Sequence, residues 1–209
     1  SVKFARGGGE AMSLAVRIAR AHTKRDKVLF SGYHGWTDWY LSANLDLSCN
    51  LDEHLLPGLD PLGVPSGLNG TAIPFRYNDI KDFDKVLEQH QDAGVIVIEG
   101  ARHDLPNIDF LKTIEVKAKE KDIVIIVDEI TSGFRMSNSG VYTSFDFNPH
   151  IAVYGKALGN GFAISAVVGK KEVMKSAQDT FISSTMWTER VGFVAGLSTL
   201  NKLNKYNVY

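Results

Sequence analysis

The sequence predicts an α/β fold, a three-layer α/β/α sandwich around a mostly parallel central sheet. Two segments, 94–100 and 122–129, are continuous β-branched runs with almost no polar interruption, which is typical of strands buried on both faces of a parallel sheet. Between them, residues 107–122 form an amphipathic stretch suited to a crossover helix. Strand and helix alternate elsewhere too, which predicts helices on both faces.

The first part of the chain supplies further elements. Residues 1–4 are a short strand candidate, and residues 10–23 carry a stripe of alanine, leucine and isoleucine at helical spacing. Residues 27–32 are strand-like, and residues 71–79 return to the sheet. Between these strands, residues 41–72 are rich in Gly, Pro, Asn and Asp, so we expect a long irregular excursion of functional or mobile character.

The second part repeats the pattern. Residues 79–91 are predicted as a helix that precedes the first β-branched run. Residues 150–155 and 163–170 are two more short strands on either side of a glycine-rich loop, and residues 193–204 are a last helix. No internal repeat or low-complexity segment interrupts this order, which again favours a single α/β architecture.

Composition narrows the classes of protein. The 209 residues carry 23 basic and 24 acidic side chains, a formal charge of −1, which gives no indication of a nucleic-acid partner. No apolar run reaches the roughly 20 residues that a membrane helix needs. Cys49 is the only cysteine, which fits a reducing compartment such as the cytoplasm. No signal peptide opens the chain, and both ends look like the inside of a longer protein.

Two turns at predicted strand ends could contact a ligand. Residues 7–9 are three glycines before a helix, and N–H groups at a helix N-terminus suit a phosphate. A flexible turn with Glu10 beside its own helix end is an equally good explanation. Tyr33, in the turn after 27–32, can stack on a flat ring, although packing at the rim explains it better when taken alone.

Acidic side chains end the second β-branched run. Asp128 and Glu129 follow five β-branched residues that are expected to be buried. A carboxylate in such surroundings needs a cationic or hydrogen-bonding partner. Successive side chains point to opposite faces, so only one of the two can face a given ligand. A helix cap or a salt bridge at the rim is the structural alternative. No clustered His or further Asp lies at ligand spacing, so we expect no metal site.

A lysine follows the strand at 150–155. Lys156 lies among small residues at the same rim, where it is either a solvated charge or a nucleophilic amine. Ala157 takes the place of the Ser or Thr of a P-loop, which excludes that motif. The hydroxyl-rich residues 183–188 can cap a helix or bind an oxyanion.

The combination is more specific than its parts. A phosphate cradle, a ring stacker, a buried carboxylate and a lysine follow one another, each at a strand end. Pyridoxal 5′-phosphate (PLP) uses all four: the carboxylate keeps the pyridine nitrogen protonated, and the lysine forms a Schiff base with the aldehyde. The sequence therefore predicts a PLP site.

The motifs resemble those of the class III aminotransferases, which are fold-type I PLP enzymes, and above all the glutamate-1-semialdehyde aminomutase branch. The likeness covers nearly the whole chain, and its two most specific motifs are "IIVDEITSGFR" and "YGKALGNGFAISAVVG". The segments "GGGEAMSLAVRIARAHTKRDKV", "SGYHGWTD" and "VIVIEG" are also similar to family motifs. The resemblance implies that 1–209 is the large PLP-binding domain, without the family's N-terminal segment and C-terminal small domain.

The resemblance also implies roles for individual residues. Lys156 would be the Schiff-base lysine, and Asp128 would hold the pyridine nitrogen. Tyr33 would stack on the ring, and the backbone of Gly8 and Gly9 would hold the phosphate.

Four further residues are carried over from the resemblance. His34 and Thr131 would bind the cofactor, with Thr131 beside its 3-hydroxyl group. Thr185 would reach the phosphate of a neighbouring subunit, which would make the protein a homodimer with shared active sites. Glu99 is a candidate substrate contact.

Some positions depart from the family pattern. Gly100 replaces a proline after Glu99, Thr131 stands where the family often has a polar or sulfur side chain, and 188–193 replaces a Gly-Asn-Pro stretch. These departures argue against a strict aminomutase. They favour a related aminotransferase of a more specialised, biosynthetic metabolism.

The predicted activity is therefore PLP-dependent transfer of an amino group between an amine or amino acid and a carbonyl compound. Lys156 would move a proton as general base and acid after its Schiff base is displaced. An aminomutase or an amino-acid racemase would use the same residues. A non-catalytic binding or assembly protein of this fold would be expected to have lost Lys156 or Asp128, and both are present.

Overall fold

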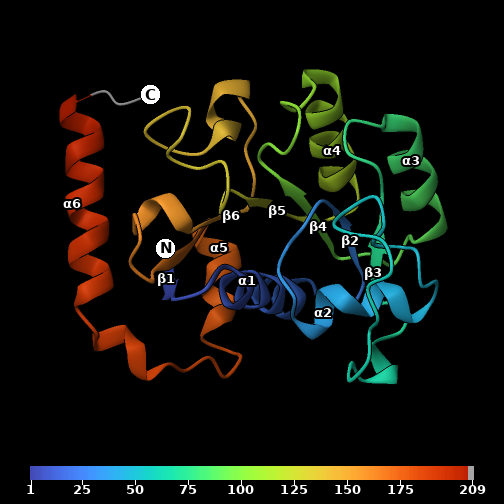
Figure 1. Ribbon diagram of the computed structural model, residues 1–209. Helices are drawn as coiled ribbons and strands as arrows, with labels where there is room; N and C mark the ends of the chain where they lie inside the picture. The colour runs from blue at the N-terminus through green and yellow to red at the C-terminus, as the bar shows by residue number, and fades with distance from the viewer. Residues whose placement is uncertain (207–209) are drawn as a thin grey trace.

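One seven-stranded sheet organises the computed structural model, which describes residues 1–206 (Figure 1). Its order is β1-β7-β6-β5-β4-β2-β3. Strands β2 to β6 run parallel to their neighbours within that group, whereas β7 is antiparallel to β6 and β1. The prediction of a mostly parallel sheet is confirmed. The strands are β1 (Val2–Ala5), β2 (Val28–Ser31), β3 (Ala72–Pro74), β4 (Val95–Glu99), β5 (Val124–Asp128), β6 (Ile151–Tyr154) and β7 (Ser165–Gly169).

Helices cover both faces of the sheet, as predicted. Helices α1 (Gly8–Thr23) and α5 (Lys171–Met174) lie on one face, and α3 (Ile80–Gln89) and α4 (Ile108–Glu120) lie on the other (Figure 1). Helix α6 (Val191–Tyr206) stands at the edge, where it contacts the short 3-10 turn after β6.

Alternation along the strands divides the core into two clusters. In β5, Val124 and Ile126 pack in the cluster beneath α1, and Ile125 and Val127 pack in the cluster beneath α3 and α4. Since the side-chain period of a strand is two residues, Asp128 faces the α1 side of the sheet. The alternation thus selects which of the two acidic residues at this strand end faces α1.

Side-chain caps fix where the covering helices begin. Asp79 accepts a hydrogen bond from the N–H of Asp82 at the start of α3, and Asn107 accepts one from the N–H of Asp109 at the start of α4. Such caps satisfy N–H groups that the first helical turn leaves without partners, each worth about 1 kcal/mol. The helix predicted at 79–91 therefore begins one residue later, because its first residue is the cap.

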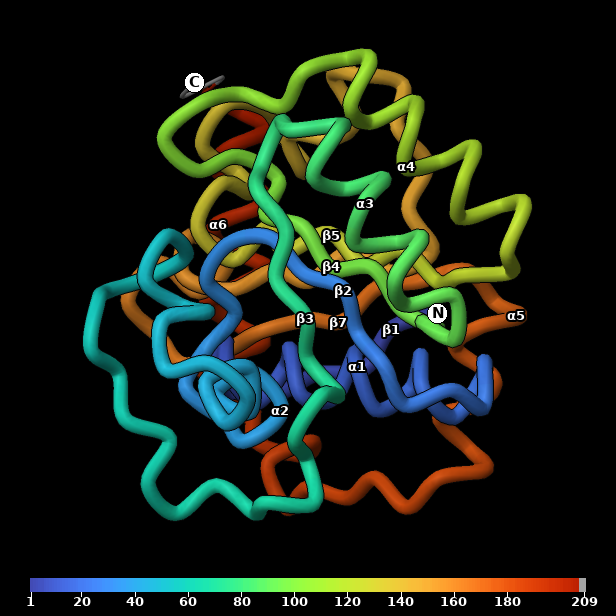
Figure 2. The backbone as a smooth tube through the Cα atoms, turned by 90° about the vertical axis from the view of Figure 1, so that its right-hand side faces the viewer, coloured from blue at the N-terminus to red at the C-terminus, as the bar shows by residue number. Residues whose placement is uncertain are grey.

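The long excursion predicted at 41–72 is present, and Figure 2 shows it leaving α2 (Asp38–Leu41) and returning at β3. It contains two short 3-10 turns, Ser42–Leu45 and Ser66–Leu68. Strand β3 is shorter than the predicted 71–79. The four-residue helices α2 and α5 were not predicted, since neither is long enough to show helical periodicity.

Within residues 1–206, no helix has the length and apolar character needed to cross a membrane.

Candidate active site

A cavity of about 890 Å³ opens where the carboxyl ends of β5 and β6 meet the N-terminus of α1. Six of the nine predicted site residues line it. They come from four segments that are far apart in sequence, and the parallel sheet brings them to one edge. The six are Gly8, Gly9, Tyr33, Asp128, Thr131 and Lys156.

Asp128 and Lys156 reach this cavity from neighbouring strands. Asp128 is the last residue of β5 and lies opposite Val153 of β6, and Lys156 follows three residues later. The Asp128 side chain is only 6% exposed. Its Oδ1 accepts a hydrogen bond from the N–H of Ile130 at 3.0 Å, which holds the carboxylate in one orientation.

Lys156 is held much more lightly. Its Nζ donates a hydrogen bond to Thr131 Oγ1 at 2.8 Å, and the residue is exposed. Its φ angle of 40° lies in the left-handed region, which costs energy in a residue with a Cβ. Thr131 is itself anchored through its carbonyl, which accepts a hydrogen bond from Arg135 Nε at 2.6 Å. The amine thus projects into the cavity on a strained backbone with one side-chain hydrogen bond.

The first turn of α1 forms another wall. Gly8 and Gly9 are the first two residues of the helix, where N–H groups have no partner within the helix. The turn at Gly35 packs directly on them: a Cβ at Gly35 would come within 2.7 Å of the Gly9 Cα, and the Gly35 φ angle is +96°. Glycine at positions 9 and 35 therefore permits this close approach, and both Gly8 and Gly9 line the cavity. The chemistry of this wall suits an anion.

Tyr33 completes the cavity from the turn after β2. Its ring meets the Tyr40 ring edge-on at a centroid distance of 5.8 Å. Its backbone N–H donates to Glu99 Oε2 at 3.3 Å, and Tyr40 Oη donates to the carbonyl of Gly32 at 3.0 Å. Hydrogen bonds to Glu99 and from Tyr40 thus hold the turn that carries the Tyr33 ring.

The other three predicted residues do not line this cavity. His34 is buried behind Asp128, and its Nδ1 lies 2.9 Å from Asp128 Oδ2. Glu99 is also buried and pairs with Arg102 at 2.8 Å. Thr185 is exposed at the start of a 3-10 turn before α6, and its contact with a neighbouring subunit stays a prediction.

Glu129, the second acidic residue after β5, turns away from the cavity. It is fully buried, and its carboxylate accepts hydrogen bonds from Ser132 Oγ and from the N–H of Tyr142 at 3.1 Å. Burial raises the pKa of this carboxyl group. Glu129 therefore ties the loop that follows β5 to the chain near Tyr142.

A second buried histidine lies behind the turn of Tyr33. His54 Nδ1 accepts a hydrogen bond from the N–H of Gly32 at 3.2 Å. Burial, with a smaller contribution from the charge of His34, lowers the pKa of His54 to about 4. His54 is consequently neutral at physiological pH, and it links the 41–72 excursion to the site.

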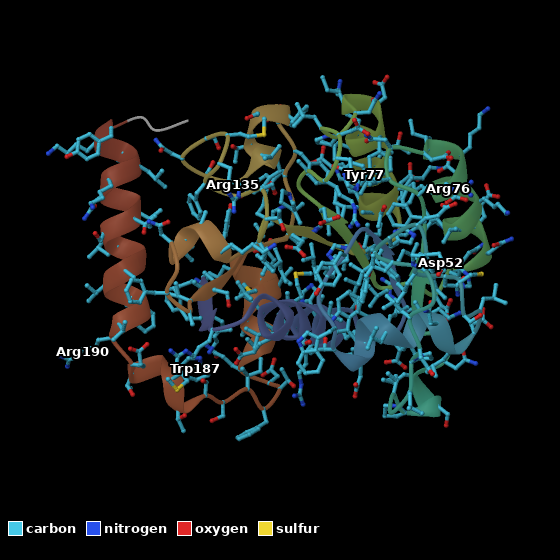
Figure 3. The ribbon with its side chains drawn as sticks, in the orientation of Figure 1. Asp52, Arg76, Tyr77, Arg135, Trp187 and Arg190 are labelled. Carbon is cyan, nitrogen blue, oxygen red and sulfur yellow. The ribbon has the colours of Figure 1, made fainter. Side chains whose placement is uncertain are left out.

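Sequence reasoning missed much of the remaining lining, including three large side chains. Arg6, Trp36 and Phe162 line the cavity, and Trp36 and Phe162 are 74% and 57% exposed. Their positions in the sequence could have indicated two of them, because Arg6 directly follows strand β1 and Trp36 follows the turn that carries Tyr33. The segment before α6 lies near Arg6, since Trp187 Nε1 donates to the carbonyl of Phe4 at 2.9 Å (Figure 3).

In the part of the chain that the structure describes, no group of three or more His, Cys, Asp or Glu side chains is arranged to hold a metal ion.

Comparison with known proteins places this geometry in a family. The model of the aminotransferase class III family matches residues 1–209. The chain is 33% identical to the 3-aminobutyryl-CoA aminotransferase of Cloacimonas acidaminovorans, a match that covers 95% of this chain and 46% of the relative. It is 34% identical to the glutamate-1-semialdehyde 2,1-aminomutase of Sulfurisphaera tokodaii, over 100% of this chain and 50% of that protein.

A solved structure agrees. A transaminase with PLP bound matches with a TM-score of 0.84 and 25% identity, over 97% of this chain and 49% of that one. The chain spans about half the length of the relatives that it matches. On the family match over its whole length, the chain belongs to the class III aminotransferase family.

Proposed function

We propose that the chain is the large, cofactor-binding domain of a PLP-dependent aminotransferase. The enzyme would move an amino group between an amine or amino acid and a carbonyl compound. One observation carries the proposal: Lys156 and Asp128 line the same cavity from adjacent parallel strands, next to the open N-terminus of α1. An amine, a carboxylate and an anion cradle around one cavity are the groups that PLP requires.

The residues present fit the cofactor. The backbone of Gly8 and Gly9 would hold its phosphate, Asp128 its ring nitrogen, and Lys156 its aldehyde carbon. Tyr33 would lie against its ring, and Thr131 beside its 3-hydroxyl group. When bound, PLP supplies an aldehyde and a ring that accepts electrons.

The protein's own groups divide the remaining work. Lys156 would take a proton from the substrate carbon that bears the amine and return one later in the reaction, as general base and acid. Its exposure and its single side-chain hydrogen bond to Thr131 leave the amine free to move. Asp128 is buried and oriented by Ile130, so it would keep a fixed negative charge against a positively charged ring atom.

The names of the relatives include two kinds of reaction, and the reaction of this chain has to be chosen between them. One is named for amino transfer to or from a CoA-linked compound, and the other for an intramolecular aminomutase reaction. We favour transfer because Gly100 replaces the family's proline after Glu99 and because 188–193 departs from the family pattern. The aminomutase is the second candidate, with support from several relatives at 31–34% identity.

Three broader features remain predictions from sequence. They are a homodimer with shared active sites, in which Thr185 contacts the neighbouring subunit, a contact between Glu99 and substrate, and a cytoplasmic location.

An isotope experiment tests the activity. Purified protein supplied with PLP would be incubated with a panel of ¹⁵N-labelled amino acids and amines, with pyruvate and 2-oxoglutarate as acceptors. We expect ¹⁵N in alanine or glutamate by mass spectrometry. Isomerised or racemised donor without label in either acceptor would instead identify an aminomutase or racemase.

A further inference from the structure

The contacts of His34 specify its protons. Nε2 lies 3.1 Å from the carbonyl oxygen of Ser31, and Nδ1 lies 2.9 Å from Asp128 Oδ2. A carbonyl oxygen only accepts hydrogen bonds, so Nε2 must carry a hydrogen. Both ring nitrogens have oxygen partners, which also fixes the orientation of the ring.

The second contact requires another proton. A neutral ring protonated at Nε2 would turn the lone pair of Nδ1 toward a carboxylate oxygen, which also has only lone pairs. A proton must therefore lie between Nδ1 and Oδ2. Imidazole is the stronger base of the two groups, so the proton belongs on Nδ1, which donates to the Asp128 carboxylate.

Burial protects this pair from exchange with water. The His34 side chain is fully buried, and Asp128 is 6% exposed. The His34 ring stacks on Trp39 at a centroid distance of 6.2 Å, and Phe30 and Tyr40 meet it edge-on at 6.2 and 6.0 Å. In such surroundings a charge without a partner is expensive, and a hydrogen-bonded pair is hard to break.

We infer that His34 is an imidazolium that carries both ring protons and acts as a positioning residue for Asp128. It holds one carboxylate oxygen from behind, while Ile130 holds the other. The negative charge of Asp128 therefore stays in place and its remaining lone pairs face the cavity. Resting on the proposed function, this pair would strengthen binding of ligands with a basic ring nitrogen, and His34 itself would not touch the ligand.

His54 provides an internal contrast. It is also buried in the same region, but its Nδ1 faces the N–H of Gly32 in place of a carboxylate. His54 should therefore carry one ring proton and His34 two. The difference lies in the partner of Nδ1 and not in the degree of burial.

Nitrogen NMR tests the proton count without any ligand. The six histidines would be labelled with ¹⁵N, and spectra at neutral pH would be assigned by the signals lost in His34→Gln and His54→Asn. We expect both His34 nitrogens to be of the protonated type, and His54 to show one protonated and one unprotonated nitrogen. An unprotonated Nδ1 in His34 would overturn the inference.

Two amide variants separate the two contacts of the ring. In His34→Asn the side-chain amide can occupy the place of Nδ1 and still donate to Asp128. In His34→Gln it can occupy the place of Nε2 and reach only Ser31. The probes are 4′-deoxypyridoxine 5′-phosphate, which has the ring nitrogen but no aldehyde, and benzyl phosphate, which lacks that nitrogen.

We expect His34→Gln to lower the affinity for the pyridine probe about tenfold, the loss typical of one charge-assisted hydrogen bond. His34→Asn should lose less, and benzyl phosphate should bind all three proteins alike. Equal losses for both probes, or none in His34→Gln, would contradict the positioning role. If the unmodified protein binds neither probe, the proposed function fails while the NMR result still decides the state of His34.

Discussion

The inner and outer walls of the cavity are built in opposite ways. On the inner wall, Asp128 is buried with His34 directly behind it, and backbone groups of Ile130 and Ser31 orient the two side chains. On the outer wall, Lys156 is exposed and donates one side-chain hydrogen bond.

The difference follows from what each wall has to do. A group that must keep one charge works best where water is excluded and neighbouring dipoles are fixed. An amine that must form and break covalent bonds needs space to move and few hydrogen bonds that hold it in place. The left-handed backbone of Lys156 is consistent with strain that local structure imposes at a functional position.

The largest effect should come from removing the fixed charge of the inner wall. Asp128→Asn keeps the size of the side chain but loses the negative charge, so amino transfer should slow about a thousandfold, by analogy with other electrostatic groups. The rate of ¹⁵N transfer measures this. Asp122→Asn, just before the other end of β5, is the matched control and should leave turnover unchanged. Normal turnover in Asp128→Asn would refute its assigned role.

The next effect concerns pH and the buried histidine behind the Tyr33 turn. The pKa of His54 is about 4 in the folded protein, against an ordinary value of 6.5. Between these values the unfolded chain binds a proton that the folded chain does not. The contribution of His54 to the free energy of unfolding should therefore be fully present above about pH 6.5. It should fall by about 3 kcal/mol as the pH drops toward 4.

Urea denaturation across this pH range would measure the loss. His54→Asn retains an acceptor for the N–H of Gly32 but does not titrate, so its stability should vary less with pH. Identical pH profiles for the two proteins would show that His54 does not carry this dependence.

A smaller effect should come from the contact between the Tyr33 turn and α1. Gly35→Ala places a Cβ against the backbone of Gly9 and forces a positive φ on alanine, which should cost about 2 kcal/mol. Gly58 also has a positive φ but open space around it, so Gly58→Ala should cost about 1 kcal/mol. Urea denaturation compares them. Equal losses would mean that the close packing at Gly9 adds nothing.

The two walls also differed in how well sequence predicted them. Continuous β-branched runs were enough for the α/β fold, and glycine turns and strand-end residues were enough for five of the cavity residues, while Thr131 was expected only from the family resemblance. The contact between His34 and Asp128 was not predictable, because β4 lies between β2 and β5 in the sheet. Only the strand order shows that the β2 turn reaches across β4 to the end of β5.

Ion pairs with loop residues were a second feature that the sequence could not predict. Glu99 ends β4 in the same way that Asp128 ends β5, yet it pairs with Arg102 and supports Tyr33 from behind. Which strand-end carboxylate faces the cavity depends on loop residues such as Arg102, whose path has no sequence periodicity.

Site-specific labelling tests the central claim most directly. The protein would be incubated with PLP, reduced with sodium borohydride and digested, and the modified peptide identified by mass spectrometry. We predict one modification, on Lys156, with none at that peptide in Lys156→Ala. Modification scattered over other lysines, or its absence from Lys156, would contradict the account.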